Sequence, residues 1–216
     1  MEMIYVFGDS HRSFFTDTHP GSSSPGKKGI FVSYTLGPGT AHNFYENRHA
    51  EMMKILNNTN LSDDCGVVIV AGEIDCRLHI PKIHLETGER IPELVEDTVN
   101  RFMKSILEVK ELGYKVIAWG PHPTRHLETL KYSKEWYYGD QRMRNQTCWA
   151  FNEVLYKCAI KNNIPFCTTF YNLLREYDTY TVYDEAYIDP LHLNQVLWSA
   201  TERTLGQIYD NYTNFQ

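Results

Sequence analysis

Short apolar runs alternate along this chain with longer stretches in which apolar residues recur every three or four positions. The short runs are rich in β-branched and aromatic residues, which is typical of buried strands. Five strands are predicted, at residues 3–7, 30–34, 65–71, 115–119 and 164–168. The longer stretches predict helices with one buried face, at residues 41–57, 92–112, 141–162 and 193–212.

The stretch from residue 92 to residue 112 shows the helical pattern most clearly. Its apolar positions include Val95, Val99 and Phe102, which lie on one face of a helix. Pro92 suits the first helical turn, and Gly113 suits the position just after a helix. This segment is therefore expected to be scaffold.

Strands that alternate with helices predict an α/β protein. We expect a three-layer α/β/α sandwich with a mostly parallel five-stranded sheet. The sequence has no internal repeat and no stretch of linker composition, so a single domain over residues 1–216 is expected. The polar segment 11–28 predicts a surface loop, either a flap over the site or an ordinary connector.

Composition adds a few constraints. Of 216 residues, 42% are hydrophobic and 22% are charged, as in an ordinary globular protein. The formal net charge of -6 argues against nucleic acid as the main partner, because phosphate binding favours a basic face. No apolar run approaches the roughly 18 residues of a membrane helix, and no signal peptide precedes the first strand. We therefore expect a cytoplasmic protein that binds no membrane and keeps its five scattered cysteines as free thiols.

The first strand leads directly into Gly8-Asp9-Ser10-His11. Open α/β sheets hold their chemistry at the carboxyl ends of the strands, which is where this segment places a hydroxyl group. Ser10 is therefore the candidate nucleophile.

A serine needs a base, and the base needs a third group to orient it. Near the other end, the chain reads Asp189-Pro190-Leu191-His192 before the last predicted helix. This spacing allows one loop to carry both groups, with Asp189 on one imidazole nitrogen of His192 and Ser10 on the other. These three residues form a candidate catalytic triad.

Gly-Asp-Ser after the first strand and Asp-x-x-His before the last helix resemble the SGNH, or GDSL-type, hydrolase family. The resemblance spans nearly the whole chain. It implies the flavodoxin-like SGNH fold and ester hydrolysis through an acyl-enzyme, with no cofactor and no metal. It also implies an oxyanion hole formed by the N–H of Ser10 and by a glycine of the second block. We favour Gly37, with Gly39 as the alternative. A purely structural interpretation is that these glycines form a turn and have no role at the oxyanion.

The third block departs from the family pattern. The usual form is Gly-x-Asn-Asp, in which the Asn donates to the oxyanion, whereas this chain has Ile74 at that place. Loss of one such donor typically lowers the rate by about 10²- to 10³-fold. The block resembles a variant subgroup with Gly-Glu-Ile-Asp. Arg77, or less readily His79, is a candidate replacement donor, but Arg77 can equally form a salt bridge with Glu73 or Asp75.

Several other residues lie near predicted strand ends and are candidates for substrate binding. For His122, which lies between two prolines, and for Asp75, which can hold the loop, a structural role is the alternative. The aromatic run 136–138 either shapes the cleft for a sugar ring or packs on its rim. The substrate-binding candidates are Asp9, His11, Glu73, Asp75 and His122.

The leading functional hypothesis is a serine esterase that removes a small acyl group, such as acetyl, from a small polar molecule or a glycan. The family also includes acyltransferases, and the sequence leaves the oligomeric state open. One alternative is a metal-dependent phosphoesterase that uses Asp9 and His11 as ligands, but it requires a Gly-Asn-His block that the sequence lacks. The other alternative is a binding protein that keeps the scaffold without catalysis, and the change at Ile74 keeps this alternative open, although Ser10, Asp189 and His192 are all present.

Overall fold

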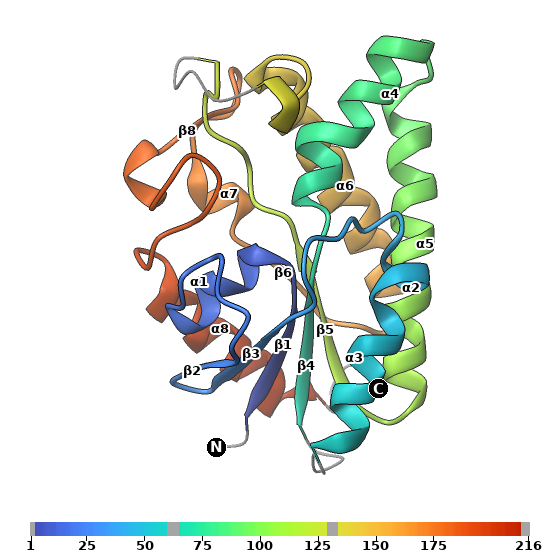
Figure 1. Ribbon diagram of the computed structural model, residues 1–216, viewed down its shortest axis with the longest axis vertical. Helices are drawn as coiled ribbons and strands as arrows, with labels where there is room; N and C mark the ends of the chain where they lie inside the picture. Colours follow the sequence, from blue (N-terminus) through green and yellow to red (C-terminus); the bar gives the residue numbers. More distant parts are fainter. Residues whose placement is uncertain (1–2, 60–64, 129–133, 213–216) are drawn as a thin grey trace.

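The central sheet of the computed structural model has six strands in the order β2-β3-β1-β4-β5-β6 (Figure 1). The structure describes residues 3–59, 65–128 and 134–212. All strands run parallel except β2, which pairs antiparallel with β3. The strands are β1 Ile4–Gly8, β2 Gly26–Lys28, β3 Phe31–Thr35, β4 Gly66–Val70, β5 Lys115–Gly120 and β6 Phe166–Thr168. The predicted α/β class with a mostly parallel sheet is confirmed.

Helices cover both faces of this sheet. Figure 1 shows α2, α3, α5 and α6 on one face, with α1 and α8 on the other. The described helices are α1 Ser13–Thr16, α2 Phe44–Asn47, α3 His49–Asn58, α4 Ile80–Thr87, α5 Ile91–Glu111, α6 Gln141–Lys161, α7 Phe170–Leu173 and α8 Trp198–Asp210. Short 3-10 or π turns form η1 Ser10–Arg12, η2 Asp75–His79, η3 Lys134–Trp136 and η4 Asp184–Ala186. The result is a three-layer α/β/α sandwich.

Strand β4 lies at the centre of the sheet, and all five of its residues are buried. Its continuous Val-Val-Ile-Val run suits a parallel strand that is covered by helices on both faces. In chain order, the parallel strands follow the 2-1-3-4-5 arrangement of flavodoxin-like folds. Their carboxyl ends therefore meet at one edge of the sheet, which faces upward in Figure 1.

The expected surface loop 11–28 is only partly a loop, and the predicted five-stranded sheet is one strand too small, because the central sheet has six. The segment contains α1 and the edge strand β2. Phe14 and Phe15 are buried and pack against Trp119 of β5. These two adjacent aromatic residues hold a stretch that is polar on average against the sheet. The average composition of the segment therefore gave no sign of this apolar contact.

Two predicted helices have different boundaries in the structure. The segment 41–57 forms two short helices, which meet at Arg48, and the guanidinium of Arg48 donates to the carbonyl of Pro38. The last helix begins at Trp198 instead of residue 193, because Leu193 pairs with Tyr187 in a β-bridge and Asn194 N–H donates to Ala186 O. The tyrosine-rich run before it holds a small hairpin of β7 Leu174–Glu176 and β8 Thr181–Val182.

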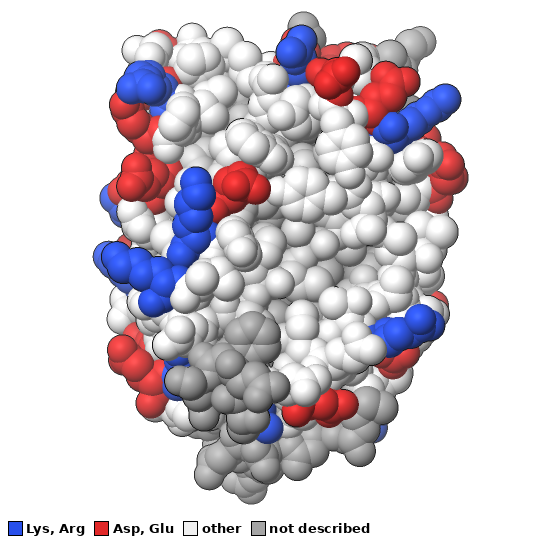
Figure 2. Space-filling model, turned by 180° about the vertical axis from the view of Figure 1, so that it is seen from behind, with Lys and Arg blue, Asp and Glu red and all other residues white. Residues whose placement is uncertain are grey.

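Charges of both signs mix on the face seen from behind. In Figure 2, Lys and Arg side chains stand near Asp and Glu side chains around the margin, and uncharged residues form much of the centre. Within the described part of the chain, no helix combines the length and the apolar character required to cross a bilayer.

Candidate active site

Strand β1 delivers Ser10 to the edge of the sheet where the parallel strands end. Gly8, its last residue, lies so close to β4 that a Cβ there would meet Val70 O at 2.5 Å. Asp9 then caps η1, because its carboxylate accepts the N–H of His11 at 2.9 Å. The cap starts the 3-10 turn at Ser10, which lines the same cleft as Ile74 and Arg77 from the segment that follows β4.

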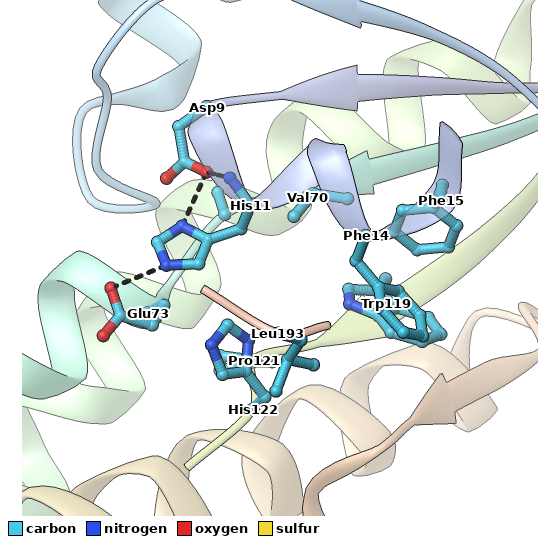
Figure 3. Close-up of a pocket in the computed structure, with 11 residues that line it drawn as sticks. Asp9, His11, Phe14, Phe15, Val70, Glu73, Trp119, Pro121, His122 and Leu193 are labelled. Carbon is cyan, nitrogen blue, oxygen red and sulfur yellow. Dashed lines mark hydrogen bonds and ion pairs between the residues drawn. The ribbon is translucent and has the colours of Figure 1, made fainter. Parts of the chain in front are cut away.

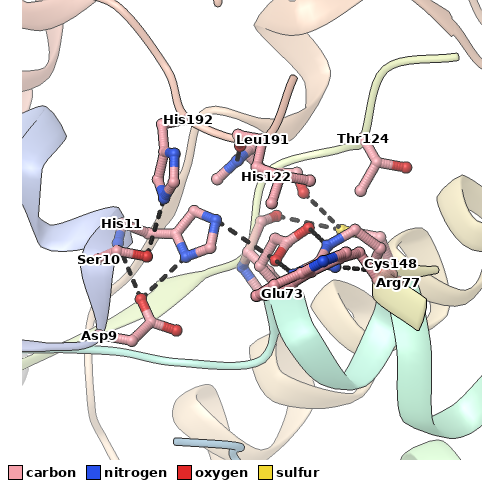
Figure 4. Close-up of polar contacts among 12 residues, drawn as sticks. Asp9, Ser10, His11, Glu73, Arg77, His122, Thr124, Cys148, Leu191 and His192 are labelled. Atoms are coloured by element: carbon pink, nitrogen blue, oxygen red, sulfur yellow. Dashed lines mark hydrogen bonds and ion pairs between the residues drawn. The ribbon is translucent and has the colours of Figure 1, made fainter. Parts of the chain in front are cut away.

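The structure brings Ser10, His192 and Asp189 together. Ser10 Oγ lies 2.8 Å from His192 Nε2, and His192 Nδ1 lies 2.7 Å from Asp189 Oδ2 (Figure 4 shows the first of these contacts). This is the geometry in which an imidazole can accept a proton from a serine while a carboxylate fixes its tautomer.

The loop that carries Asp189 is held by its own backbone. Asp189 Oδ1 accepts the N–H groups of Leu191 and His192, each at 2.8 Å. Burial alone would raise the pKa of Asp189, but these N–H donors and His192 lower it below its ordinary value. Asp189 therefore remains a carboxylate that can orient His192.

A chain of buried ionisable groups, formed by Asp9, His11, Glu73 and Arg77, lies beside Ser10 and His192 in Figure 4, and Figure 3 shows its first three members. His11 Nδ1 lies 2.9 Å from Asp9 Oδ1, and His11 Nε2 lies 3.3 Å from Glu73 Oε2. Arg77 completes the chain by binding Glu73 through Nε at 2.7 Å and Nη2 at 3.1 Å. Burial alone would raise the pKa of Glu73, but Arg77 and then His11 lower it to about 2. Glu73 therefore carries its charge at neutral pH.

Of the two interpretations of Arg77, the structure favours the salt bridge with Glu73. Its Nη1 also donates to the carbonyl of Trp136, so the guanidinium is held from both sides. Arg77 nevertheless lines the open cleft at Ser10. Asp75 is not its partner.

The cleft above Ser10 is wide, with a volume of about 480 Å³. Its walls come from the ends of β1 and β3, the segment after β4, the 3-10 turn η3 and the loop 20–23. The indole of Trp136 lies at this wall and is 52% exposed. The predicted site residues that line the cleft are Asp9, Ser10, His11, Gly37, Arg77 and His192.

The two glycine candidates lie in different places. Gly37 lines the cleft with φ of +73°, and its N–H donates to Thr35 Oγ1 at 3.2 Å. Gly39 packs against the side chain of Arg48 and is not a lining residue of this cleft. Ile74, at the position of the family's Asn, also lines the cleft.

Asp75 lies away from Ser10, in a second cavity of about 220 Å³ that His79 also lines. Its carboxylate accepts the N–H groups of Ala41 at 2.6 Å and His42 at 3.3 Å. Burial raises the pKa of Asp75 to about 6, although these N–H donors lower it. Its observed contacts are those of a residue that holds the loop after β3, and it does not lie in the cleft as a substrate-binding residue would.

His122 and Glu73 line a small internal cavity and not the open cleft (Figure 3). His122 Nε2 lies 3.1 Å from the carbonyl of Leu191, next to His192. Burial, and then the charge of nearby His11, lower the pKa of His122 to about 4. A neutral His122 donates through Nε2 to the loop that carries Asp189 and His192.

Arg12 is a residue whose importance the sequence did not reveal. Its buried guanidinium donates to Ser33 Oγ at 2.7 Å and to the carbonyls of Ser22 at 2.7 Å and Ser24 at 3.2 Å. Residues 20–23 line the cleft, so Arg12 fixes one of its walls. An arginine in a polar stretch gives no periodic signal that would have identified this role.

No group of three or more His, Cys, Asp or Glu side chains among residues 3–59, 65–128 and 134–212 is arranged to hold a metal ion. Asp9 and His11, the metal ligands of the phosphoesterase hypothesis, are paired with each other.

Comparisons with known proteins identify the fold. No family model matches the sequence, and no curated protein matches it. Among solved structures, a GDSL-like lipase from Bacteroides thetaiotaomicron is 13% identical, with 97% of this chain and 88% of that chain covered and a TM-score of 0.64.

Two carbohydrate-related esterases are similar as well. Est24, a carbohydrate acetylesterase from Sinorhizobium meliloti, is 14% identical, with 96% of this chain and 100% of that chain covered and a TM-score of 0.57. A mutant of Axe2, an acetyl-xylooligosaccharide esterase from Geobacillus, is 13% identical, with 96% and 94% covered and a TM-score of 0.59. The protein therefore has the SGNH hydrolase fold that its sequence motifs predicted.

Proposed function

We propose that the protein is a serine ester hydrolase in which Ser10 is the nucleophile, His192 the base and Asp189 the group that orients it. The observation that carries this proposal is the unbroken contact chain from Ser10 Oγ to His192 Nε2 and from His192 Nδ1 to Asp189 Oδ2, at 2.8 and 2.7 Å. The fold shared with lipases and acetylesterases supports it.

The reaction proceeds in two halves. Ser10 Oγ attacks the ester carbonyl while His192 Nε2 takes the hydroxyl proton, and the proton then passes to the leaving alcohol as the C–O bond breaks. In the second half, His192 takes a proton from water, whose oxygen attacks the acyl-enzyme. The acid leaves, and the proton returns to Ser10.

The oxyanion of each tetrahedral intermediate requires N–H donors. The N–H groups of Ser10 and Gly37 are the proposed donors. The bond from Gly37 to Thr35 Oγ1 is long, at 3.2 Å, and a negatively charged oxygen would compete with it well. Arg77 lines the same cleft, and we assign it a supporting positive charge there because Glu73 and Trp136 restrain its guanidinium.

The proposed substrate is a small acyl ester, such as an acetyl ester, of a small polar molecule or a glycan. An open cleft with the exposed indole of Trp136 at its wall suits a sugar ring, which packs on a flat aromatic face. Two of the similar structures are named for acetylated carbohydrates, which supports the same class.

A non-catalytic binding protein is the second candidate, because Ile74 removes a donor that working enzymes of the family use. The two candidates differ in whether Ser10 forms an acyl-enzyme.

Hydrolysis of p-nitrophenyl acetate by the purified protein and by Ser10→Ala, each with and without a chelator, tests the proposal. We expect turnover that survives chelation and falls by at least about 10³-fold in the variant. Equal rates in both proteins, or no turnover in either, would overturn it, and chelator-sensitive turnover would favour metal chemistry.

A further inference from the structure

We propose that His11 is a doubly protonated imidazolium that acts as a positioning residue, because its charge keeps His192 in the neutral form that can accept the proton of Ser10. This inference rests on the proposed function, since it concerns the base of the same triad. His11 would act through His192 and would not itself react with the ester.

The ring of His11 lies between two carboxylates. Nδ1 is 2.9 Å from Asp9 Oδ1, and Nε2 is 3.3 Å from Glu73 Oε2 in an ion pair that lacks the geometry of a linear hydrogen bond. All three side chains are buried. A neutral imidazole has a single N–H, so the lone pair of the other ring nitrogen would lie beside a carboxylate. Two protons on the ring remove this repulsion on both sides.

Glu73 does not readily take over the proton of His11. Arg77 binds both oxygens of Glu73, which keeps the pKa of Glu73 at about 2 although burial opposes this. Burial would lower the pKa of His11, but the charges of Asp9 and Glu73 outweigh it and raise the pKa above its ordinary value. The charge of Arg77 acts in the opposite direction on His11, and its effect is smaller.

His11 and His192 are neighbours, with ring centroids 4.9 Å apart (Figure 4). Asp189 faces His192 from its own loop, Ser10 and His11 face it from η1, and Glu73 acts on it from beyond β4. His122, from the segment after β5, lies on the other side of His11 with its ring centroid also at 4.9 Å.

These groups compete over the protonation of His192. Burial and then the charge of His11 oppose its charged form, whereas Asp189 and Glu73 favour it, and the balance lowers the pKa of His192 below its ordinary value. An aspartate partner alone would have raised it. The imidazolium of His11, together with burial, thus lets His192 serve as a base at lower pH than an exposed Asp-His pair would allow.

The test begins with histidine-detected NMR of the isotope-labelled protein, which needs no substrate. In the wild-type protein at about pH 8, both ring nitrogens of His11 are expected to carry protons while His192 is neutral. In His11→Gln, the pKa of His192 is expected to rise by about one unit, because the variant lacks the positive charge that opposes protonation of His192. The size of the shift corresponds to an effective dielectric constant between those of protein and water.

His122→Gln is the matched control. It removes the second buried imidazole that neighbours His11, and because that imidazole is neutral, the pKa of His192 should stay within about 0.3 units. The acid limb of kcat/KM for p-nitrophenyl acetate should move to higher pH by about one unit in His11→Gln and not in the control. If His11 had only a structural role, His11→Gln would lower the maximum of kcat/KM without moving the acid limb of its pH profile.

A neutral His11 in the wild-type protein at pH 8, or an unchanged His192 pKa in a folded His11→Gln variant, would overturn the inference. If the variant does not fold, the wild-type spectrum decides, because it reports the His11 protons directly. If the protein hydrolyses no ester, the proposed function fails while the NMR titration still decides the state of His11.

Discussion

Glu73 and Arg77, one helical turn apart, form a buried ion pair through two contacts of 2.7 and 3.1 Å. The same guanidinium donates to the carbonyl of Trp136, so the segment after β4 is tied to η3 at the rim of the cleft. Because Glu73 also contacts His11, this pair links the rim of the cleft to the ring of His11, next to His192.

Removal of Arg77 should destabilise the fold strongly. Arg77→Ala leaves the Glu73 carboxylate buried with one fewer positive partner, and breaking a buried pair typically costs about 3–5 kcal/mol. Urea unfolding measures this loss. The matched control is Arg90→Ala, whose pair with Glu93 is exposed and should contribute less than about 0.5 kcal/mol. Similar losses in both variants would contradict the expectation.

Restoration of the family's donor should raise activity. Ile74→Asn places an amide at the wall of the cleft that Ser10 also lines, and if this amide donates to the oxyanion, kcat/KM for p-nitrophenyl acetate should rise by up to about 10²-fold. Ile74→Ala enlarges the cleft without a donor and should give no such gain. A gain in both variants would attribute the effect to space, and no gain in either would mean that the oxyanion hole is already complete.

Arg12 should control the wall formed by residues 20–23. Arg12→Ala removes the donors to the carbonyls of Ser22 and Ser24, so KM should rise several-fold for a bulky ester while kcat changes less. Arg12→Lys keeps the charge but loses the planar fork and should rescue binding only in part. Steady-state kinetics with acetyl esters of small and large alcohols measure the difference. An equal fall in kcat for every substrate would contradict this assignment.

Asp75 should make stability fall as pH rises through about 6. Its pKa of about 6 in the folded state lies above the ordinary 3.8. Between these two pH values the folded state therefore binds the proton of Asp75 more tightly than the unfolded state does. The contribution of Asp75 is therefore fully present below about pH 4 and is lost as pH rises. Relative to Asp75→Asn, the wild-type protein should lose on the order of 2–3 kcal/mol between these pH values.

Urea unfolding of both proteins at several pH values from about 4 to 7 measures this difference. Glu73, with a pKa of about 2, titrates below the window and should affect both proteins alike. A difference between the two proteins that does not vary with pH would show that Asp75 stays ionised throughout.

The secondary structure could be predicted where a local pattern was strong. The helix expected at 92–112 is α5, Ile91–Glu111, because its apolar face repeats over several turns. The segment 11–28 was misjudged, because α1 and β2 are too short to carry a period. β2 pairs only with β3, and α1 is stabilised by Phe14 and Phe15 packing under distant strands, so neither is a property of the segment alone.

In the candidate site too, local features could be predicted from the sequence and long-range contacts could not. Ser10 follows a strand and Asp189 precedes His192 by three residues, and such local placements can be read from the chain. Whether Arg77 points to an oxyanion or to Glu73 depends on contacts with Trp136, which lies 59 positions later. The partners of Asp75, Ala41 and His42, precede it by more than thirty positions.

The sequence by itself determined the order along the chain of the five parallel strands and the longest helices and the three residues that are candidates for the triad, because periodicity and short spacings are local properties of the chain. Only the tertiary structure decided that Ser10 and His192, 182 positions apart, lie 2.8 Å from each other, and that His11 faces two carboxylates. The direction of a side chain and the charge of its surroundings depend on elements that packing brings together from distant parts of the sequence, and no local pattern encodes them.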